Sequence, residues 1–247
     1  MHLPTQPRIS LIVPAHNEEH YLGRLLDSVD IARSRYWRGP DAVEVVVADD
    51  GSTDATTDVA ARRGCRVVRL EARKIAAARN AGARSAHGSV FAFVDADTRI
   101  HPGTFDAVDE LMSSPRVVAA ATGVSPERWS IGIAVTYAIL VPWVWLLRMD
   151  TGVVFCRSDD FRAIGGYDER RSFAEDVQLL VDLRRLGRPR RQRLARARSV
   201  KAISSTRKFD RHGEWHYFRL IAHLLLPMIR QPGLRDELVE KYWYRDR

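Results

Sequence analysis

Two acidic residues separated by a single position are the first pair in this sequence that could do chemistry. Asp95 and Asp97 come directly after the apolar run at residues 90–94. Two carboxylates at such a point can direct oxygens at a hard divalent cation, Mn²⁺ or Mg²⁺, which keeps coordination positions open for substrate phosphates. Taken alone, a turn with two solvated aspartates is the commoner explanation of this spacing. Its meaning therefore depends on the surrounding elements and motifs.

The elements that position this pair alternate in type along the chain. Continuous β-branched apolar runs predict strands, and apolar residues at helical spacing between them predict helices. This alternation indicates an α/β fold with a mainly parallel central sheet and helices on both of its faces. We expect strands at residues 9–13, 43–48, 66–70, 90–94, 117–122 and 152–156, and helices around residues 22–29, 54–63, 74–86 and from Glu175 onward.

Polar clusters follow three of the expected strands. They are residues 14–18, 49–54 and 95–97. Because ligands bind outside the carboxyl ends of strands in an open parallel sheet, these clusters meet where a site belongs. The first cluster lacks the glycine-rich turn of a dinucleotide-binding fold, which argues against a Rossmann dehydrogenase. In the second, Gly51 permits a tight turn, and Ser52 or Asp54 can cap the following helix.

Five short motifs lie in a fixed order along the chain. They are Pro14-Ala15-His16-Asn17-Glu18, Asp49-Asp50-Gly51-Ser52-Thr53-Asp54, Ala77-Ala78-Arg79-Asn80-Ala81-Gly82, Asp95-Ala96-Asp97 and Glu175-Asp176. This set resembles glycosyltransferase family 2, whose members have the GT-A fold, over about residues 9–186. The resemblance implies a metal-dependent, inverting hexosyltransferase. Such an enzyme moves one sugar from a nucleotide diphosphate sugar, with UDP-sugars foremost, to a hydroxyl or phosphate acceptor.

The resemblance also assigns the donor-binding residues. Asp50 would read the edge of the base, Asp95 would face the ribose or a metal-bound water, and Asp97 would ligate Mn²⁺ or Mg²⁺ directly. The cation would neutralise charge that builds on the departing nucleoside diphosphate. The other donor-binding residues would be Pro14, His16 and Glu18 in the base and ribose pocket, Lys74 at the start of a helix and Arg79 near the diphosphate.

The acceptor side is expected downstream. Glu175 and Asp176 open a helix, where acids often serve only to cap the first turn. In the family, the acid at Asp176 is the general base that deprotonates the acceptor hydroxyl for an in-line, inverting attack. A turn just upstream resembles the segment that shapes the acceptor site in relatives, although it could simply reverse the chain. Its residues are Gly165, Gly166, Tyr167 and Asp168.

The net charge of +8 is concentrated in one segment. Residues 184–211 carry twelve Arg or Lys against Asp210 alone, so this segment has a charge of +11 and the rest of the chain −3. A local basic patch of this kind favours phosphate or an anionic surface. Aromatic residues are not interleaved with it as base-stacking platforms would be, so no nucleic-acid partner is expected.

Within the basic segment, residues 204–212 are expected to form a flexible lid over the donor phosphates. Arg207 and Lys208 are the candidates for phosphate contacts. Some GT-A enzymes recruit a third metal ligand from a C-terminal histidine, so His212 could complete the metal site. An exposed histidine in a basic loop is the alternative. The processive members of the family carry a Gln-x-x-Arg-Trp motif that residues 192–196 lack, so we expect one sugar per acceptor.

A long apolar segment raises the question of a membrane. Ile131–Leu147 has no charged residue but is short for a transmembrane helix and contains Pro142. Its tryptophans suit the headgroup interface, so we expect peripheral contact with an anionic membrane and a lipid-linked acceptor. A buried core or homodimer helix and a true span are the alternatives. Residues 1–8 lack an apolar signal region, so the protein is expected in the cytoplasm, at the inner face of the cell membrane.

The chain is expected to contain one catalytic domain. We predict a GT-A domain at residues 1–200, with a nucleotide-sugar half at 1–100 and an acceptor half at 101–200, and a basic lid with an amphipathic helical tail at 201–247. Cys65 and Cys156 show no metal-ligand spacing and are interpreted as free thiols. The alternative functions are a nucleotidyltransferase and a non-catalytic, membrane- or RNA-associated protein that retains the fold.

Overall fold

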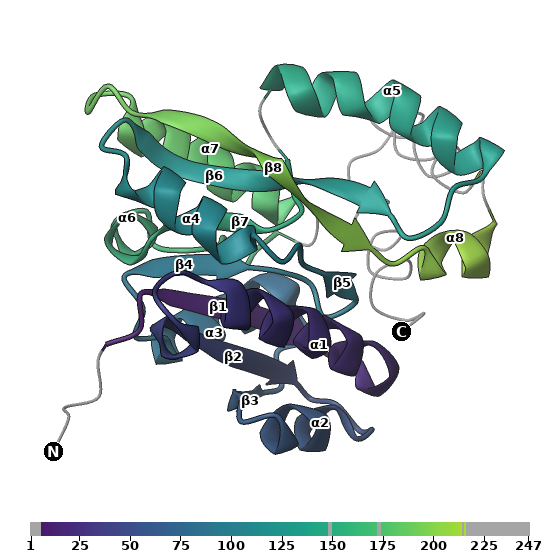
Figure 1. Ribbon diagram of the computed structural model, residues 1–247. Helices are drawn as coiled ribbons and strands as arrows, with labels where there is room; N and C mark the ends of the chain where they lie inside the picture. Colours follow the sequence, from purple (N-terminus) through teal and green to yellow (C-terminus); the bar gives the residue numbers. More distant parts are fainter. Residues whose placement is uncertain (1–5, 148–149, 172–173, 214, 216–247) are drawn as a thin grey trace, which may run out of the picture.

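An eight-stranded sheet forms the centre of the computed structural model, which describes residues 6–147, 150–171, 174–213 and 215. Its strand order is β3-β2-β1-β4-β7-β6-β8-β5 (Figure 1). The strands are β1 (Ile9–Ala15), β2 (Val43–Asp50), β3 (Arg66–Leu70), β4 (Val90–Phe93), β5 (Thr98–Arg99), β6 (Val117–Pro126), β7 (Val154–Arg157) and β8 (Arg193–Ser204). The helices are α1 (Glu19–Arg35), the 3₁₀ helix η1 (Pro40–Ala42), α2 (Thr56–Arg62), α3 (Ile75–Ser85), α4 (Thr104–Ser113), α5 (Ile131–Leu147), α6 (Ser158–Ala163), α7 (Glu175–Gly187) and α8 (Arg207–His212).

The sheet is mixed but mostly parallel. β1 runs parallel to β2 and β4, β2 to β3, and β6 to β8. β7 is antiparallel to both of its neighbours, β4 and β6, and β5 is antiparallel to β8. The predicted mainly parallel α/β sheet is therefore confirmed. Because β1, β2 and β4 are parallel, their carboxyl ends lie at one edge and bring the three polar clusters together.

Helices cover both faces of the sheet, as the buried runs of the strands require. Leu11 and Val13 of β1 pack with α1 and α4, whereas Ile12 between them packs on the opposite face with α3 and α7. β1, β2 and β4 are buried on both faces because each successive side chain meets a helix layer. Cys65 and Cys156 are free thiols, as predicted.

The C-terminal part of the described chain is more regular than the sequence suggested. Residues 204–212, predicted as a flexible lid, comprise the end of β8 followed by α8. β8 pairs with β6 on either side of residues 198–200. Closure of this segment over the donor phosphates stays a prediction. The domain boundary expected at residue 200 falls inside β8. The strand expected at residues 152–156 is β7, which begins two residues later.

α5 crosses one end of the molecule beside α8 (Figure 1). None of the helices that the structure describes is both long enough and apolar enough to span a bilayer. Among the described side chains of α5, the large apolar ones that are exposed are Ile131, Ile139 and Val141. Trp129, which precedes the helix, is exposed as well.

Candidate active site

The loops after β1 and β2 are joined by a set of hydrogen bonds. The Asn17 amide donates to Ser52 Oγ (2.9 Å), and the Thr53 amide donates to Asn17 Oδ1 (2.9 Å). The Glu18 amide donates to Thr56 Oγ1 (2.7 Å). Asp54 Oδ1 accepts the amide of Thr56, the first residue of α2 (2.9 Å), although the N-cap residue itself is Ala55. These contacts hold the two polar clusters as one rigid edge.

Asp50 uses its carboxylate to shape the loop before α3. Its Oδ1 accepts the amides of Ala72 (2.7 Å) and Arg73 (2.8 Å), and its Oδ2 accepts the amide of Lys74 (2.7 Å). His16 Nδ1 lies 2.8 Å from the Asp50 carbonyl oxygen, so that nitrogen must carry a proton and donate. The contact of Asp50 with a base stays a prediction. The structure gives this residue a role in positioning the loop.

Asp95 and Asp97 follow β4 and face a cavity. The Asp95 side chain is 50% exposed and that of Asp97 is 14% exposed. Two carboxylates on one short turn form a hard oxygen donor set, which fits Mn²⁺ or Mg²⁺ with water and diphosphate oxygens as the remaining ligands. Among the described residues there is no cluster of three or more His, Cys, Asp or Glu that could hold a metal ion.

Arg207 lies against this pair. Its guanidinium forms a bidentate ion pair with Glu18 (2.6 and 2.7 Å), and its Nε lies 2.9 Å from Asp97 Oδ2. The guanidinium also lies over the ring of Tyr21, with its carbon 4.7 Å from the ring centroid. Burial lowers the pKa of Arg207, but the hydrogen bonds that it donates to Glu18 and the charge of Asp97 outweigh this effect and raise the pKa. Glu18 and Arg207, separated by 189 positions, thus form one charged cluster with Asp97.

Arg79 of α3 connects the end of β4 to the start of α7. Its Nη1 donates to Glu175 Oε1 and to Asp176 Oδ1, and its Nη2 donates to Asp95 Oδ1, each at 2.8 Å. The side chain is only 3% exposed. Burial lowers the pKa of Arg79, yet the three carboxylates raise it well above its usual value. The predicted contact of Arg79 with the diphosphate stays a prediction; in this structure the guanidinium binds three acids.

Asp176, the predicted general base, is held at the start of α7 through one of its two carboxylate oxygens. Its Oδ1 accepts from both Arg79 and the hydroxyl of Tyr167 (2.9 Å), while no described residue bonds to its Oδ2. Burial raises the pKa of Asp176 to about 6, although Arg79 opposes this shift, and the charges of Glu175 and Asp95 add to it. A carboxylate of this pKa is deprotonated at neutral pH and still basic enough to take a proton.

The expected acceptor turn packs against α3. Asn80 Oδ1 accepts the Tyr167 amide, and Asn80 Nδ2 donates to the Tyr167 carbonyl, both at 2.9 Å. Gly165 and Gly166 have φ angles of 81° and 78°, and a Cβ on Gly166 would lie 2.6 Å from Asn80 Oδ1. The close backbone approach at Gly166 is therefore to Asn80. Contact of this turn with an acceptor stays a prediction.

Other predicted residues lie near the rim or beyond the described side chains. Lys74 Nζ donates to the Glu169 carbonyl (3.3 Å), and Asp168 pairs with Arg170 (2.9 Å). Lys208 and His212 belong to α8, but their side chains lie outside the described residues. The predicted phosphate contact of Lys208 and metal ligation by His212 are therefore not described.

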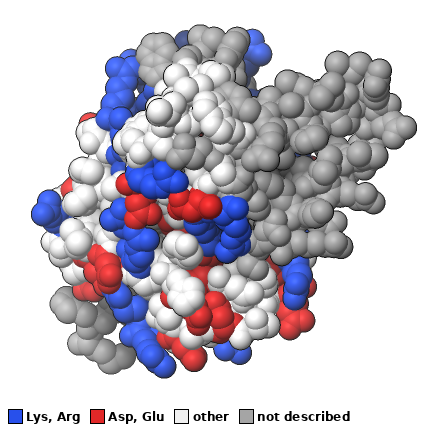
Figure 2. Space-filling view, turned by 90° about the vertical axis from the view of Figure 1, so that its right-hand side faces the viewer, with Lys and Arg blue, Asp and Glu red and all other residues white. Residues whose placement is uncertain are grey.

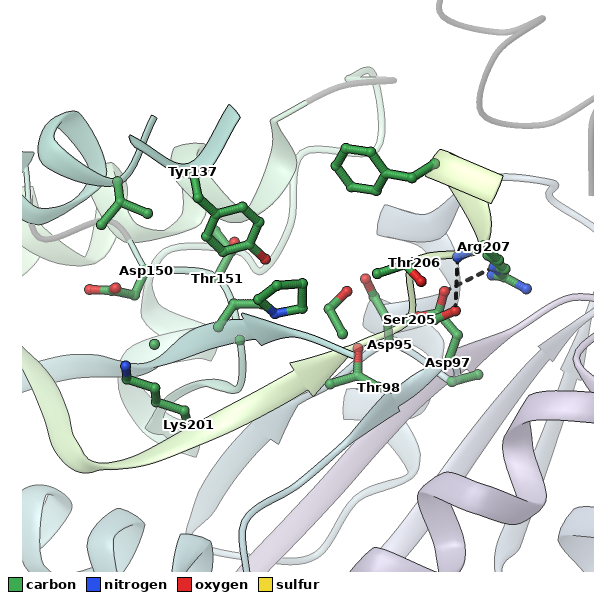
Figure 3. Close-up of a pocket in the computed structure, with 18 of the residues that line it drawn as sticks. Asp95, Asp97, Thr98, Tyr137, Asp150, Thr151, Lys201, Ser205, Thr206 and Arg207 are labelled. Carbon is green, nitrogen blue, oxygen red and sulfur yellow. Dashed lines mark hydrogen bonds and ion pairs between the residues drawn. The ribbon is translucent and has the colours of Figure 1, made fainter. Parts of the chain in front are cut away.

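A cavity of about 660 Å³ extends from the end of β4 along β8 and beneath α5 (Figure 3). The predicted residues Pro14, Glu18, Asp95, Asp97 and Arg207 line it. At the opposite end, Figure 3 shows Asp150 and Lys201, with Tyr137 of α5 above them. The sequence had not singled out this second end, whose charged residues are Asp150, Arg196, Arg198 and Lys201.

Part of the basic segment is neutralised by acidic residues from elsewhere in the chain. Arg190 pairs with Asp160 (2.6 Å), Arg196 with Asp150 (2.5 Å), and Arg207 with Glu18 and Asp97. On the face toward which the parallel strands point, acidic and basic residues are intermixed (Figure 2). The excess of +11 in the sequence therefore does not correspond to eleven solvent-facing charges.

We expect Arg79→Met to destabilise the fold and raise the pKa of Asp176. Removing one partner of a buried ion cluster costs about 3–5 kcal/mol, because the remaining charges lose their compensation. Part of the loss should be recovered at low pH, where Asp176, whose pKa is raised to about 6 by burial, becomes protonated. Urea unfolding between pH 5 and pH 8 measures this effect, with Arg84→Met, an exposed change on the same helix, as the control. An equal free energy of unfolding for the two variants would contradict it.

The family model for glycosyl transferase family 2 matches residues 10–162. The chain belongs to glycosyltransferase family 2. Validoxylamine A glucosyltransferase of Streptomyces hygroscopicus subsp. limoneus is 32% identical over 137 residues, which are 53% of this chain and 27% of that protein. The pre-mycofactocin glycosyltransferase of Mycobacterium tuberculosis (strain CDC 1551 / Oshkosh) is 26% identical over 71% of this chain and 39% of its own length. The chain thus spans well under half the length of these curated relatives.

Solved structures show the same fold. The mannosyltransferase PcManGT from Pyrobaculum calidifontis, in complex with GDP-Man and Mn²⁺, has a TM-score of 0.66 and 23% identity, covering 81% of this chain and 58% of that one. Glucosyl-3-phosphoglycerate synthase from M. tuberculosis, in complex with Mn²⁺, UDP and glucosyl-3-phosphoglycerate, has a TM-score of 0.57 and 20% identity, covering 84% and 75%. The fold is therefore that of GT-A glycosyltransferases.

Proposed function

We propose that this protein transfers one sugar from a nucleotide diphosphate sugar, a UDP-sugar, to an acceptor hydroxyl with inversion at the sugar carbon. The observation that carries the proposal is the position of Arg79, which binds Asp95 at the end of β4 and Asp176 at the start of α7. One buried guanidinium thus connects the turn that is expected to bind the metal with the candidate base. Donor and acceptor chemistry can meet beside this guanidinium.

Asp176 acts on the acceptor in this proposal. Its Oδ2 takes the proton of the attacking hydroxyl, while Oδ1 remains bound to Arg79 and Tyr167. These two hydrogen bonds fix the carboxylate plane, so the base needs no rearrangement during the reaction. Asp97, with Asp95, would hold the divalent cation, which when bound supplies Lewis-acid stabilisation of the departing diphosphate. Arg207 lies beside Asp97 and supplies a further positive charge.

The choice of a UDP-sugar is supported by related structures. One structure of TarS from S. aureus contains UDP-GlcNAc, and glucosyl-3-phosphoglycerate synthase contains UDP with Mn²⁺. GDP-Man occupies PcManGT, so GDP-sugars are the main competing donors. Product analysis tests the proposal. Mass spectrometry after incubation with Mn²⁺, a panel of nucleotide sugars and a lipid extract should show one added hexose per acceptor; no transfer and no donor hydrolysis with any sugar would overturn it.

We further propose that α5 seats the protein on an anionic membrane. Support comes from Trp129 and Ile131, which are 61% and 78% exposed at the start of this apolar helix. We expect sedimentation with anionic liposomes at low salt that weakens at high salt, because charge attraction is screened. Ile131→Ser should reduce it, whereas Trp37→Ser, an exposed apolar residue after α1, should not. A protein that stays in the supernatant at low salt would remove this proposal.

A further inference from the structure

The end of the cavity farthest from Asp97 has an excess of positive charge. Asp150, which is only 6% exposed, is the acid at this end, and Arg196 binds it through two hydrogen bonds of 2.5 and 2.6 Å. That pair is neutral as a unit. The side chains of Arg198 and Lys201 also line the cavity, and neither side chain has a hydrogen bond or an ion pair with any residue that the structure describes. Two positive charges are therefore available to a ligand.

A break in the strand ladder places these two cations on the cavity. Thr122 and Gly123 are consecutive in β6, yet they pair with Ala197 and Lys201 of β8, so residues 198–200 are left out of the ladder. Side chains alternate between the two faces of a regular strand, which would put residues 198 and 201 on opposite faces. The irregularity lets both line the same cavity. Strand irregularities of this kind often re-aim side chains next to functional sites.

In the proposed function, the nucleotide diphosphate of the donor does not occupy this end of the cavity. It lies with Asp95, Asp97 and Arg207, which Figure 3 shows at the opposite side from Lys201. Between the two ends lie Thr151 and the ring of Tyr137, which leave room for the body of an acceptor (Figure 3). Two unpaired cations suit the double negative charge of a phosphate monoester better than they suit a neutral sugar.

We propose that Arg198 and Lys201 bind a phosphate group of the acceptor, so that the acceptor is a phosphorylated compound whose hydroxyl is directed toward the donor end of the cavity at Asp95 and Asp97. This inference rests on the proposed function, because it takes the other end of the cavity as the donor site. The phosphate serves as an anchor and is not the attacking group. A phosphorylated metabolite and a lipid headgroup share this chemistry.

The first test measures binding of inorganic phosphate to the full-length protein saturated with UDP and Mg²⁺, which occupies the donor end. We expect the double variant Arg198→Gln/Lys201→Gln to weaken phosphate binding by about tenfold or more, the scale of two charged hydrogen bonds. Arg193→Gln is the control, because Arg193 is an exposed residue of the same strand outside the cavity. It removes a charge without touching the site.

The outcomes separate this inference from the proposed function. Failure of the wild-type protein to bind UDP with Mg²⁺ would contradict the donor site itself. Intact UDP binding with phosphate affinity that is unchanged in the double variant, or equally reduced by Arg193→Gln, would overturn the anchor alone. The melting temperature of each variant shows that the fold is retained.

A second test separates the two sources of phosphate. Glycerol 3-phosphate is compared with glycerol, and vesicles of phosphatidylcholine with phosphatidic acid are compared with phosphatidylcholine alone. Binding of glycerol 3-phosphate that the double variant weakens supports a phosphorylated metabolite. Binding of the phosphatidic acid vesicles that the double variant weakens supports a lipid headgroup. If the double variant weakens neither, the proposal is overturned.

Discussion

Asp176→Asn should leave donor binding intact and lower kcat by about two to four orders of magnitude, the usual contribution of a general base. The amide keeps an oxygen that can accept from Arg79 and Tyr167, so the start of α7 should hold its shape. What is lost is the ability of the second position to take a proton. Isothermal titration with UDP and Mn²⁺, together with initial rates of transfer, separates binding from chemistry.

The neighbouring acid provides the control for this experiment. Glu175→Gln removes the same charge beside Arg79, and we expect a smaller loss of turnover because the proposed base, Asp176, is retained. A larger loss for Glu175→Gln than for Asp176→Asn would assign the base to Glu175. Near-normal turnover in both variants would place the base elsewhere.

The pH profile of the wild-type enzyme should carry the same signature. A base must be deprotonated to act, and the pKa of Asp176 is raised to about 6, chiefly by burial. Activity should therefore be full above pH 7 and fall with decreasing pH through about 6, because the protonated carboxyl can no longer accept a proton. This acidic limb should disappear from the residual activity of Asp176→Asn.

Asp97→Ala should abolish Mn²⁺-dependent binding of a nucleoside diphosphate, with a loss in affinity of at least about a hundredfold, or roughly 2.8 kcal/mol. Only Asp95 would then remain on this turn as a protein ligand for the cation. The fold should persist, because Arg207 keeps its bidentate contact with Glu18. Isothermal titration with UDP in the presence and absence of Mn²⁺ measures the effect.

The matched control for this change is Asp159→Ala, which removes an acid that is 93% exposed in α6. It should bind the nucleotide like the wild-type protein. Undiminished binding by Asp97→Ala would remove the metal assignment from this residue. A metal dependence that survives in Asp97→Ala but not in Asp95→Ala would move the direct ligand to Asp95.

Local signals in the sequence were sufficient for the first half of the fold. β-branched runs such as Val43–Asp50 can only be buried strands when helices follow each of them, so the parallel order and its polar edge were predictable. β8 was not predicted, because its alternate arginines look like a solvated segment until pairing with β6 is known. β5 has two residues and gives no periodic signal.

The contacts of the site were harder to predict than its residues. Asp95, Asp97 and Asp176 stand in recognisable motifs, but nothing in the spacing says that Arg79 joins Asp95 and Asp176. The pairing of Arg207 with Glu18 spans nearly the whole described chain, and sequence periodicity carries no information at that range. The second end of the cavity was missed for the same reason. The role of Asp150 as the ion-pair partner of Arg196 could not be predicted, because Arg196 lies on a strand that was not predicted.

The ion pair between Glu18 and Arg207 holds together two segments that lie near opposite ends of the described chain. Glu18 is 2% exposed, so a protein shortened before Arg207 would keep this acid inside the fold while losing the guanidinium that neutralises it. Unfolding of α8 is thereby linked to the integrity of the loop after β1. The smallest fragment that keeps the charged cluster of Glu18, Asp97 and Arg207 must extend past residue 207. This is well beyond residues 10–162, which match the family model.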